Sequence, residues 1–295
     1  MDWDNLRFFL ELSRAGKLAV AARRLEVDHS TVSRRIQALE NSLGQQLFLR
    51  GASGFSLTEA GRNLLPRAEA MESACIDIDR VREGPGEGLS GVVRIGVPEG
   101  YGVNVLASQL ALFNRQHPNL CFDLLAAPRM LQLSRREADI VITLERPVRG
   151  PYLVTRLTDY QLCLYASPQY LSGRPPIRSA EDLRELAFVS YVDDLLYSKE
   201  LQYLDELGKP AHIPLRSTSI LAQQQAVAAG VGLGILPAFS ADSDPRLVRV
   251  LGDQVVFTRT FWMLMPAELK DIARMKATWD YLRESAQAQQ TRLLG

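Results

Sequence analysis

The chain lacks the features that mark membrane and secreted proteins. None of its apolar runs reaches the ~18 residues that a transmembrane helix needs, so we expect no membrane anchor. Acidic residues precede the first apolar stretch (MDWDNLRFFLEL), which is unlike a secretory signal. Only three cysteines occur in 295 residues, and an odd number of separated thiols suits the reduced cytoplasm better than a disulfide scaffold. Cys121 and Cys163 lie in apolar strand patterns, so we interpret them as buried structural thiols rather than a redox switch.

Signatures of catalysis and of metal binding are also missing. The sequence has no Gly-x-Ser-x-Gly nucleophile elbow and no phosphate loop. Its three histidines, His29, His117 and His212, do not have the spacing of metal ligands. The glycines of VAAGVGLGILP (227–237) follow a helical pattern and enter a strand, the reverse of a dinucleotide loop. We therefore expect no enzyme activity, no cofactor and no metal site.

The formal net charge is zero, so the sum of charges does not indicate a nucleic-acid partner. The distribution of charge is more informative, because residues 17–50 carry six basic and three acidic side chains, a local net charge of +3. Such a modest positive surface would bind DNA weakly as a single copy. Dimerisation would be needed for useful affinity.

Two helices joined by a tight turn are expected in this positive segment, at residues 18–25 and 29–43 with the turn at 26–27. Asp28 suits the N-cap of the second helix, where its carboxylate could accept backbone N–H groups. Apolar residues spaced by four, three and four predict a core-facing stripe: Val32, Ile36, Leu39 and Leu43. Gly44 suits the left-handed position that ends a helix.

The opposite face of the second helix is polar. Hydroxyl and guanidinium groups near a helix N-terminus suit the base edges and phosphates of a DNA groove. The candidates are Ser30, Thr31, Ser33, Arg34 and Arg35. A helix at 3–14 is expected to cover the pair, and a glycine-rich turn between Arg50 and Leu57 predicts a two-stranded wing. The alternative is a small helical bundle with a solvated basic face.

This segment resembles the winged helix-turn-helix of the LysR-type transcriptional regulators. The matching positions are Leu6, Phe9, Ala21-Ala22, Leu25, Val32-Ser33, Ile36, Leu39-Glu40, Leu43-Gly44, Leu47-Phe48, Arg50, Leu57-Thr58 and Ala60-Gly61. The resemblance implies that Thr31, Ser33 and Arg34 contact the major groove of double-stranded DNA and that Arg50 grips the DNA backbone.

The segment departs from the family pattern at two places. Asp28-His29-Ser30 stands where Ser-Gln-Pro is common, so the base preference at the helix start cannot be transferred. Ser53 stands where the wing often has a basic residue, so one phosphate contact is expected to be missing.

A long linker helix is expected at residues 58–82, with a kink at Pro66. Small or apolar residues recur there at alternating spacings of four and three, which is typical of a coiled-coil seam. The seam residues are Leu57, Gly61, Leu64, Ala68, Met71, Cys75 and Ile78. Two joined copies could recognise an interrupted palindrome, whereas the alternative is a single helix packed on its own chain. Residues 83–90, which begin EGPGEG, predict a flexible hinge.

Residues 91–295 alternate strand-like and helical stretches, which indicates an α/β fold with mostly parallel sheets. Strands are expected at 92–97, 121–126, 139–144, 161–166, 188–191, 213–217, 233–236 and 261–265. Helices are expected at 103–116, from 131, and at 180–186, 199–208, 220–229 and 272–288. The fold class of the whole chain is therefore α + α/β, with the winged helix-turn-helix at residues 1–57.

Three parts of this region resemble the effector domain of the same regulators. They are residues 138–140, 162–168 and 227–237. That domain resembles periplasmic solute-binding proteins, in which two α/β lobes crossed by two strands hold a ligand in the cleft. The resemblance implies an effector-binding domain at 91–295, with lobe one at 91–161 plus 262–295 and lobe two at 162–261.

Ligands in such folds lie beyond the carboxyl ends of strands, so the residues there are candidates for binding the effector. The candidates are Glu99, Gly100, Tyr101, Arg129, Thr143, Glu145, Asp193, Ser217 and Thr218. Ser217 and Thr218 precede a helix whose free N–H groups could hold an anion. Glu99 and Arg129 together would suit a small polar metabolite.

The leading hypothesis is a sequence-specific transcriptional regulator, a homodimer or homotetramer, that a small-molecule effector controls from between two lobes. A ligand can shift such a protein only by its difference in affinity for two arrangements. The alternative is a solute-binding or adaptor protein whose N-terminal domain docks protein rather than DNA.

Overall fold

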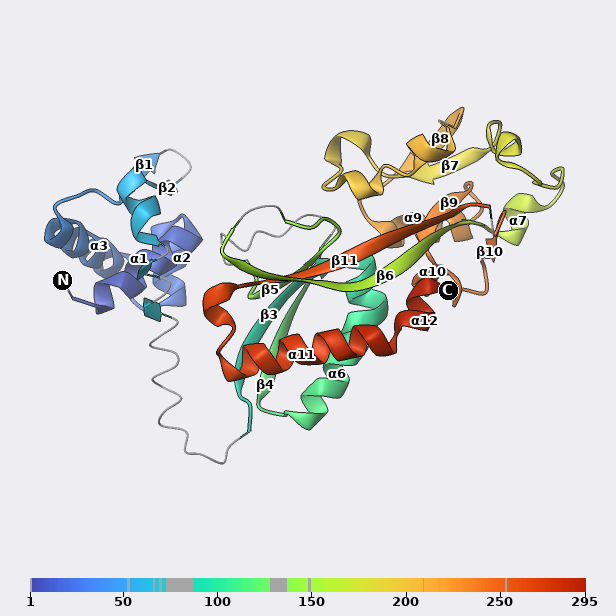
Figure 1. Cartoon of the computed structure of the whole chain (residues 1–295). Helices are drawn as coiled ribbons and strands as arrows, with labels where there is room; N and C mark the ends of the chain where they lie inside the picture. The colour runs from blue at the N-terminus through green and yellow to red at the C-terminus, as the bar shows by residue number, and fades with distance from the viewer. Residues whose placement is uncertain are drawn as a thin grey trace. The chain divides into compact units, whose positions relative to one another are not determined.

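The computed structural model describes residues 2–51, 54–65, 67–68, 71–72, 88–127, 137–147, 150–208, 210–252 and 254–295. The chain divides into two compact units, Met1–Glu87 and Gly88–Gly295 (Figure 1). No helix in the described ranges is long and apolar enough to cross a membrane. Several predictions lie outside the described residues, namely those for Ser53, Pro66, Cys75, Ile78, Arg129, most of the hinge and the helix from 131.

Unit 1 contains the predicted winged helix-turn-helix. Its elements are α1 (Asp4–Ala15), α2 (Leu18–Arg24), α3 (His29–Leu43), β1 (Phe48–Gly51) and β2 (Gly54–Leu57). β1 and β2 pair antiparallel as the wing. The core is formed by apolar residues of all three helices and of β1, including Phe9, Leu12, Ala21, Val32, Leu39 and Phe48. The predicted helix boundaries are confirmed to within one residue.

The turn and the ends of α3 differ from the prediction in two details. Asp28 occupies the N-cap position, but its side chain makes no capping hydrogen bond. Leu43 is 37% exposed and does not belong to the core stripe, because Gly44 ends the helix immediately after it. Gly44 has a φ of 66°, which confirms the predicted left-handed helix end. Glu26, in the turn, also has a positive φ, of 56°.

The wing is held to the helices by backbone contacts at Leu47. The Glu40 carboxylate accepts hydrogen bonds from the N–H groups of Leu47 (2.7 Å) and Phe48 (3.2 Å). Thr58 donates its N–H to the Leu47 carbonyl at 2.9 Å, and its hydroxyl accepts the Gly61 N–H at 3.0 Å. A Cβ atom at Gly61 would lie 2.3 Å from the Leu47 carbonyl oxygen, so only glycine allows this approach.

The start of the linker helix packs on its own unit. Residues 59–65, 67–68 and 71–72 are helical. Ala68 is fully buried in the core of unit 1, and Leu64 packs against that core. Gly61 and Ala68 are buried within the unit and are therefore not available to the predicted intermolecular seam, whereas Leu57 and Leu64 are half-buried and the seam stays a prediction there. Met71, by contrast, is 40% exposed.

Unit 2 is built on a mixed sheet with the strand order β10-β6-β11-β5-β3-β4, in which β9 also pairs with β6. The strands are β3 (Gly91–Pro98), β4 (Leu120–Ala127), β5 (Ile140–Thr143), β6 (Tyr152–Ala166), β9 (Gly234–Pro237), β10 (Val248–Arg249) and β11 (Val256–Pro266). A separate parallel pair is formed by β7 (Ala187–Ser190) and β8 (His212–Arg216).

The helices of unit 2 are mostly short. The α-helices are α5 (Glu99–Tyr101), α6 (Ala107–Gln116), α7 (Pro168–Leu171), α8 (Leu204–Leu207), α9 (Ile220–Ala228), α10 (Ala238–Ala241), α11 (Ala273–Ala288) and α12 (Gln290–Leu294). A π-helical turn, η1 (Gly102–Leu106), separates α5 from α6. The 3-10 turns among the described residues are η3 (Ala180–Leu183), η4 (Asp193–Leu195), η5 (Lys199–Leu201) and η6 (Ala267–Leu269). The helix predicted at 199–208 is thus split into η5 and α8.

Two long strands connect the two halves of unit 2. We define the first half as β3, β4, β5, α6 and α11, and the second half as β7, β8, β9, α9 and α10. β6 and β11 pair with each other along most of their length, and β6 goes on to pair with β9 (Figure 1). Because both strands run antiparallel to their neighbours, the prediction of mostly parallel sheets is wrong for β6, β9, β10 and β11.

The two described cysteines differ in environment. Cys163, on β6, is fully buried, and burial raises the pKa of its thiol. Cys121 is exposed and lies on β4, which ends the strand order of the sheet. The expectation of a buried thiol is therefore confirmed for Cys163 and wrong for Cys121.

Replacement of Gly61 tests its contact with the Leu47 carbonyl, because the expected change in the free energy of unfolding is opposite in sign to that of an ordinary helical glycine. In an exposed helix, Gly→Ala stabilises by about 1 kcal/mol. At Gly61 we expect Gly61→Ala to destabilise the protein by about 1–3 kcal/mol, because the new methyl group collides with a backbone oxygen. Urea unfolding measures this, with Gly88→Ala as the control, since a Cβ at Gly88 meets no atom within 4 Å. A more stable Gly61→Ala protein would contradict the contact.

Candidate functional site

The N-terminal part of α3 presents a polar, cationic surface. Ser30, Ser33 and Arg34 are exposed, and Thr31 is half-buried. Arg50, on β1 of the wing, is also exposed. Neither Arg34 nor Arg50 forms an ion pair with another described residue. Their guanidinium groups are therefore available to an external anion.

Arg35 differs from Arg34, because its charge is paired within unit 1 although its side chain remains 37% exposed. Its guanidinium lies 3.1 Å from the Asp2 carboxylate and 3.4 Å from that of Asp4, and it donates to Asn5 at 3.3 Å. It also stacks over the ring of Phe8, with 5.6 Å to the centroid. Arg35 thus attaches α3 to the N-terminal end of α1.

Acidic partners within unit 1 reduce the basic surface further. Arg24 pairs with Glu11 at 2.9 Å. Residues 17–50 contain six basic side chains. Four of them are exposed and form no ion pair with a described residue, namely Lys17, Arg23, Arg34 and Arg50. The free cations therefore come from α2, α3, the wing and the residue before α2.

A small cavity lies in unit 2 where β3 ends and the two halves meet. Its volume is about 30 Å³, enough for one or two water molecules. Both halves and the connecting strands contribute to its wall. The lining residues are Pro98, Glu99, Gly100, Tyr101, Leu144, Tyr160, Leu162, Tyr191, Tyr197, Leu201, Tyr203, Thr218, Ile220, Pro237, Phe239 and Phe261. We refer to it as the aromatic pocket.

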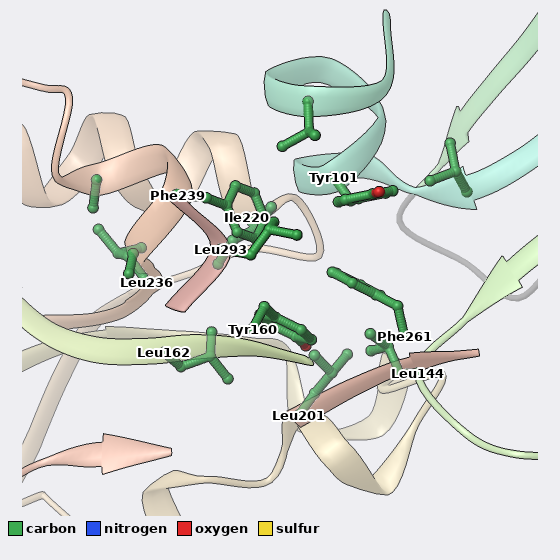
Figure 2. Packing of buried hydrophobic residues seen from close by; sticks show 14 of the residues in the cluster. Tyr101, Leu144, Tyr160, Leu162, Leu201, Ile220, Leu236, Phe239, Phe261 and Leu293 are labelled. Carbon is green, nitrogen blue, oxygen red and sulfur yellow. The ribbon is translucent and has the colours of Figure 1, made fainter. Parts of the chain in front are cut away.

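Three neighbouring rings form the centre of the aromatic pocket, with Phe261 stacked on Tyr160 and tilted against Tyr101. The Phe261 ring lies between the rings of Tyr101 and Tyr160, with centroid distances of 4.6 Å and 4.1 Å (Figure 2). Phe239 meets both tyrosine rings at steep angles. The pairing register between β11 and β6 shifts between Phe261 and Trp262, and such an irregularity re-aims a side chain.

Glycine residues bring α5 close to its neighbours. A Cβ at Gly100 would lie 3.0 Å from the side chain of Ile220, at the start of α9. A Cβ at Gly102 would lie 2.8 Å from the side chains of both Val97 and Ala126. The Gly100 contact brings α5 against α9 of the second half, and the Gly102 contact packs η1 on β3 and β4.

The tyrosines of the aromatic pocket are uncharged. Burial raises the pKa of Tyr101, Tyr160, Tyr191 and Tyr203 well above the usual value for a phenol. Burial also raises the pKa of Tyr197 to about 12, with a smaller contribution from the negative charge of Glu99. These side chains therefore present neutral rings and hydroxyl groups at physiological pH.

Glu99 is the one acidic residue among the described lining residues, and none of these is basic. Its Oε2 atom is buried and has no hydrogen-bond partner among the described residues. An unpartnered carboxylate oxygen in an apolar surrounding is costly. The pocket thus combines neutral aromatic faces with a single acid group.

Four of the predicted effector residues, Glu99, Gly100, Tyr101 and Thr218, line the aromatic pocket. Three others make hydrogen bonds within the protein instead and are not part of the lining. The Thr143 hydroxyl donates to the Glu145 carbonyl, and Ser217 Oγ accepts the Ser219 N–H at 3.1 Å. The Glu145 carboxylate accepts from the Ser198 hydroxyl and the Lys199 N–H, both at 2.8 Å, so it joins the end of β5 to η5.

Asp193 also lies outside the aromatic pocket. It lines a different hollow of about 400 Å³ beside β7 and β8, together with Gln202 and Arg216. Its carboxylate lies 4.0 Å from the Arg216 guanidinium. No group of three metal-ligating side chains occurs in the part of the chain that the structure describes.

Most of the aromatic lining was not predicted from the sequence. The missed residues are Tyr160, Tyr191, Tyr197, Tyr203, Phe239 and Phe261. All but Tyr197 are buried and occur in or beside apolar runs, so their pattern is that of ordinary core residues. What distinguishes them from ordinary core residues is that β6, β11, α10 and the segment 191–203 come together in the folded protein.

Two family models together match almost the whole chain. Residues 3–62 match the model described as "Bacterial regulatory helix-turn-helix protein, lysR family". Residues 86–287 match the model described as "LysR substrate binding domain".

Similar full-length relatives carry names of transcriptional regulators. The chain is 28% identical over 287 residues to the "Mau operon transcriptional activator" of Paracoccus denitrificans, covering 95% of each chain. It is 30% identical over 254 residues to the "Iron-regulated virulence regulatory protein IrgB" of Vibrio cholerae, covering 82% of each.

Solved structures share the fold. A full-length single-residue variant of OxyR from Pseudomonas aeruginosa is 19% identical with a TM-score of 0.72, covering 100% of this chain and 99% of that one. ArgP from Mycobacterium tuberculosis is 20% identical with a TM-score of 0.70, covering 97% of each chain.

The buried phenols predict a loss of stability in alkali. The raised pKa values favour the protonated phenols in the folded state, whereas phenols of the unfolded chain ionise near pH 10. The free energy of unfolding should therefore fall as the pH rises from about 9 to about 12. Urea unfolding and phenolate absorbance measure this together. Phenolate formation by these tyrosines near pH 10 in protein that stays folded would contradict their burial.

Proposed function

This chain belongs to the LysR family of bacterial transcriptional regulators, and we propose that α3 recognises an operator while the aromatic pocket binds the controlling effector. Family membership makes it a DNA-binding transcriptional regulator with an effector-binding domain, and not an enzyme. Such a protein acts on chromosomal DNA, so we assign it to the cytoplasm.

The proposed DNA contacts are the exposed groups of α3 and the wing. Ser30, Thr31, Ser33 and Arg34 would approach base edges and nearby phosphates of the major groove, and Arg50 would contact the DNA backbone. The free guanidinium groups of Arg34 and Arg50 support this assignment. Arg35 is better placed to fix the orientation of α3, since acidic residues of unit 1 already surround its charge.

The proposed effector site is the aromatic pocket. One observation carries this proposal: a cavity between the two halves of unit 2 holds a buried, unpartnered carboxylate oxygen among aromatic rings. Because residues of both halves line it, a ligand there would favour one arrangement of the halves over another. Its effect on DNA binding is limited by its difference in affinity for those arrangements.

We also propose a homo-oligomer, because two copies of unit 1 are needed to bind both halves of an interrupted palindrome. Gly61 and Ala68 are buried within their own unit, which favours an intermolecular contact beyond this stretch. The exposed Met71 is then its first candidate residue in the linker helix. Arg14 pairs with Glu72 at 2.6 Å, which holds this part of the helix to α1.

Replacement of Arg34 tests the DNA interface. We expect Arg34→Ala to weaken binding to the DNA upstream of the chain's own reading frame by about 1–3 kcal/mol and to reduce the salt slope by about 1. Gel-shift titrations at several salt concentrations measure both quantities. Arg115→Ala, which removes an exposed arginine from unit 2, should leave them unchanged. Equal affinities for all three proteins would instead support an adaptor whose N-terminal unit docks protein.

Replacement of Met71 tests the proposed assembly. A charge placed at an apolar contact between copies would be desolvated without a partner, so Met71→Asp should shift the protein toward monomers. Analytical ultracentrifugation of the full chain measures the distribution. Leu195→Asp is the control, because Leu195 is 59% exposed and lies in η4 of unit 2. An unchanged oligomer in Met71→Asp would remove Met71 from the interface.

A further inference from the structure

The aromatic pocket contains an acid group for which the described protein supplies no partner. Oε2 of Glu99, at the start of α5, is buried and makes no hydrogen bond to a described residue. Burial of an unpaired carboxylate oxygen is unfavourable unless another group compensates it. The position therefore calls for a donor that comes from outside the chain.

The arginines that flank this region have other partners. The Arg259 guanidinium pairs with Glu200 at 2.8 Å and lies over the ring of Phe257. Arg146 lies over the ring of Trp262, with 5.4 Å to the centroid. Neither belongs to the described lining of the pocket. Neither arginine donates a hydrogen bond to the buried Oε2 atom of Glu99.

The rest of the described lining favours a cation over an anion. The faces of aromatic rings attract ammonium groups within about 6 Å, and Tyr101, Tyr160, Phe239 and Phe261 supply four neighbouring rings. An anionic ligand would be repelled by Glu99. A neutral apolar ligand would leave Oε2 buried without a partner.

We propose that the effector carries a protonated amine, whose ammonium group binds Glu99 and whose apolar body contacts the rings of Tyr101 and Phe261. This inference rests on the effector role proposed above for the same pocket. The cavity of about 30 Å³ accepts only a very small amine as it stands. A larger body has to separate the rings, and that would couple binding to a movement of one half of unit 2 against the other.

An ammonium group can come from a simple amine or from an amino acid. Thr218 lines the pocket beside Ser219, the N-cap of the nine-residue helix α9. Ser219 Oγ accepts the Ala222 N–H, which leaves the N–H groups of Ile220 and Leu221 without intrahelical acceptors. A carboxylate beside the ammonium could bind there. Both sources share the contact with Glu99. The affinities of phenylalanine and of 2-phenylethylammonium distinguish them, because only phenylalanine carries the carboxylate.

Isothermal titration calorimetry on the full chain tests the proposal with probes matched in size. The cationic probes are n-propylammonium and 2-phenylethylammonium, the neutral ones are 1-propanol and 2-phenylethanol, and the anionic ones are propanoate and 3-phenylpropanoate. We expect at least one cationic probe to bind at millimolar concentration or better and its anionic counterpart not to bind. Tighter binding of phenylalanine than of 2-phenylethylammonium would assign the ammonium to an amino acid, and weaker binding to a simple amine.

The variant Glu99→Gln keeps the shape of the side chain and removes its charge. It should weaken binding of the cationic probe by about tenfold or more and leave neutral probes unaffected. Glu268→Gln, at an exposed acid on η6, should bind like the wild type. Equal binding of the cation by Glu99→Gln, or binding of anions alone, would overturn the proposal.

A gel shift on the same protein samples separates this inference from the proposed function. If anionic probes bind and change the DNA complex, the pocket is an effector site but the ammonium assignment is wrong. If no probe of any charge binds while DNA is still retarded, both the ammonium assignment and the effector role of the pocket fail. If the wild-type protein does not retard DNA, only the DNA-binding function proposed for unit 1 is contradicted.

Discussion

The insertion of Phe261 between Tyr101 and Tyr160 is the contact on which the account of unit 2 depends. It brings together α5, the long strand β6 and the long strand β11. Burial by these rings raises the pKa values of the surrounding phenols, and the Glu99 carboxylate oxygen beside them has no partner among the described residues. An aromatic surface beside one acid group is a specific chemical environment, and it lies where both halves of the unit can respond to an occupant.

A regulator also needs a rigid connection between its DNA-binding helices and the linker that follows. In unit 1 that connection is a backbone contact, in which the Leu47 carbonyl accepts the Thr58 N–H and packs against Gly61. Glu40 fixes the same region from α3. Because these groups link α3, the wing and the first turns of the linker helix, a change in the linker would be transmitted to α3 as a change of position.

Local sequence patterns predicted unit 1 well, because its helices have clear apolar spacing and end signals; α3 was predicted residue for residue. Local patterns could not predict that the Arg35 guanidinium donates hydrogen bonds to Asp2 and Asn5, since these residues lie thirty or more positions away in the sequence. In unit 2 the first part of β6 was missed, because its half-exposed, mixed residues have no regular alternation. Phe261 was predicted as a strand residue, but its place between two tyrosine rings depends on the register shift beside it.

A carboxylate with one buried, unpartnered oxygen among aromatic rings is proposed to bind the ammonium group of the effector, and the other proposals for unit 2 follow from this contact. A crystal structure of the full chain with 2-phenylethylammonium tests it most directly. We expect the amine nitrogen about 2.8 Å from an oxygen of Glu99, with the phenyl ring between α5 and β11. A pocket that stays closed while the amine lies elsewhere, for example beside Asp193 and Arg216, would contradict it.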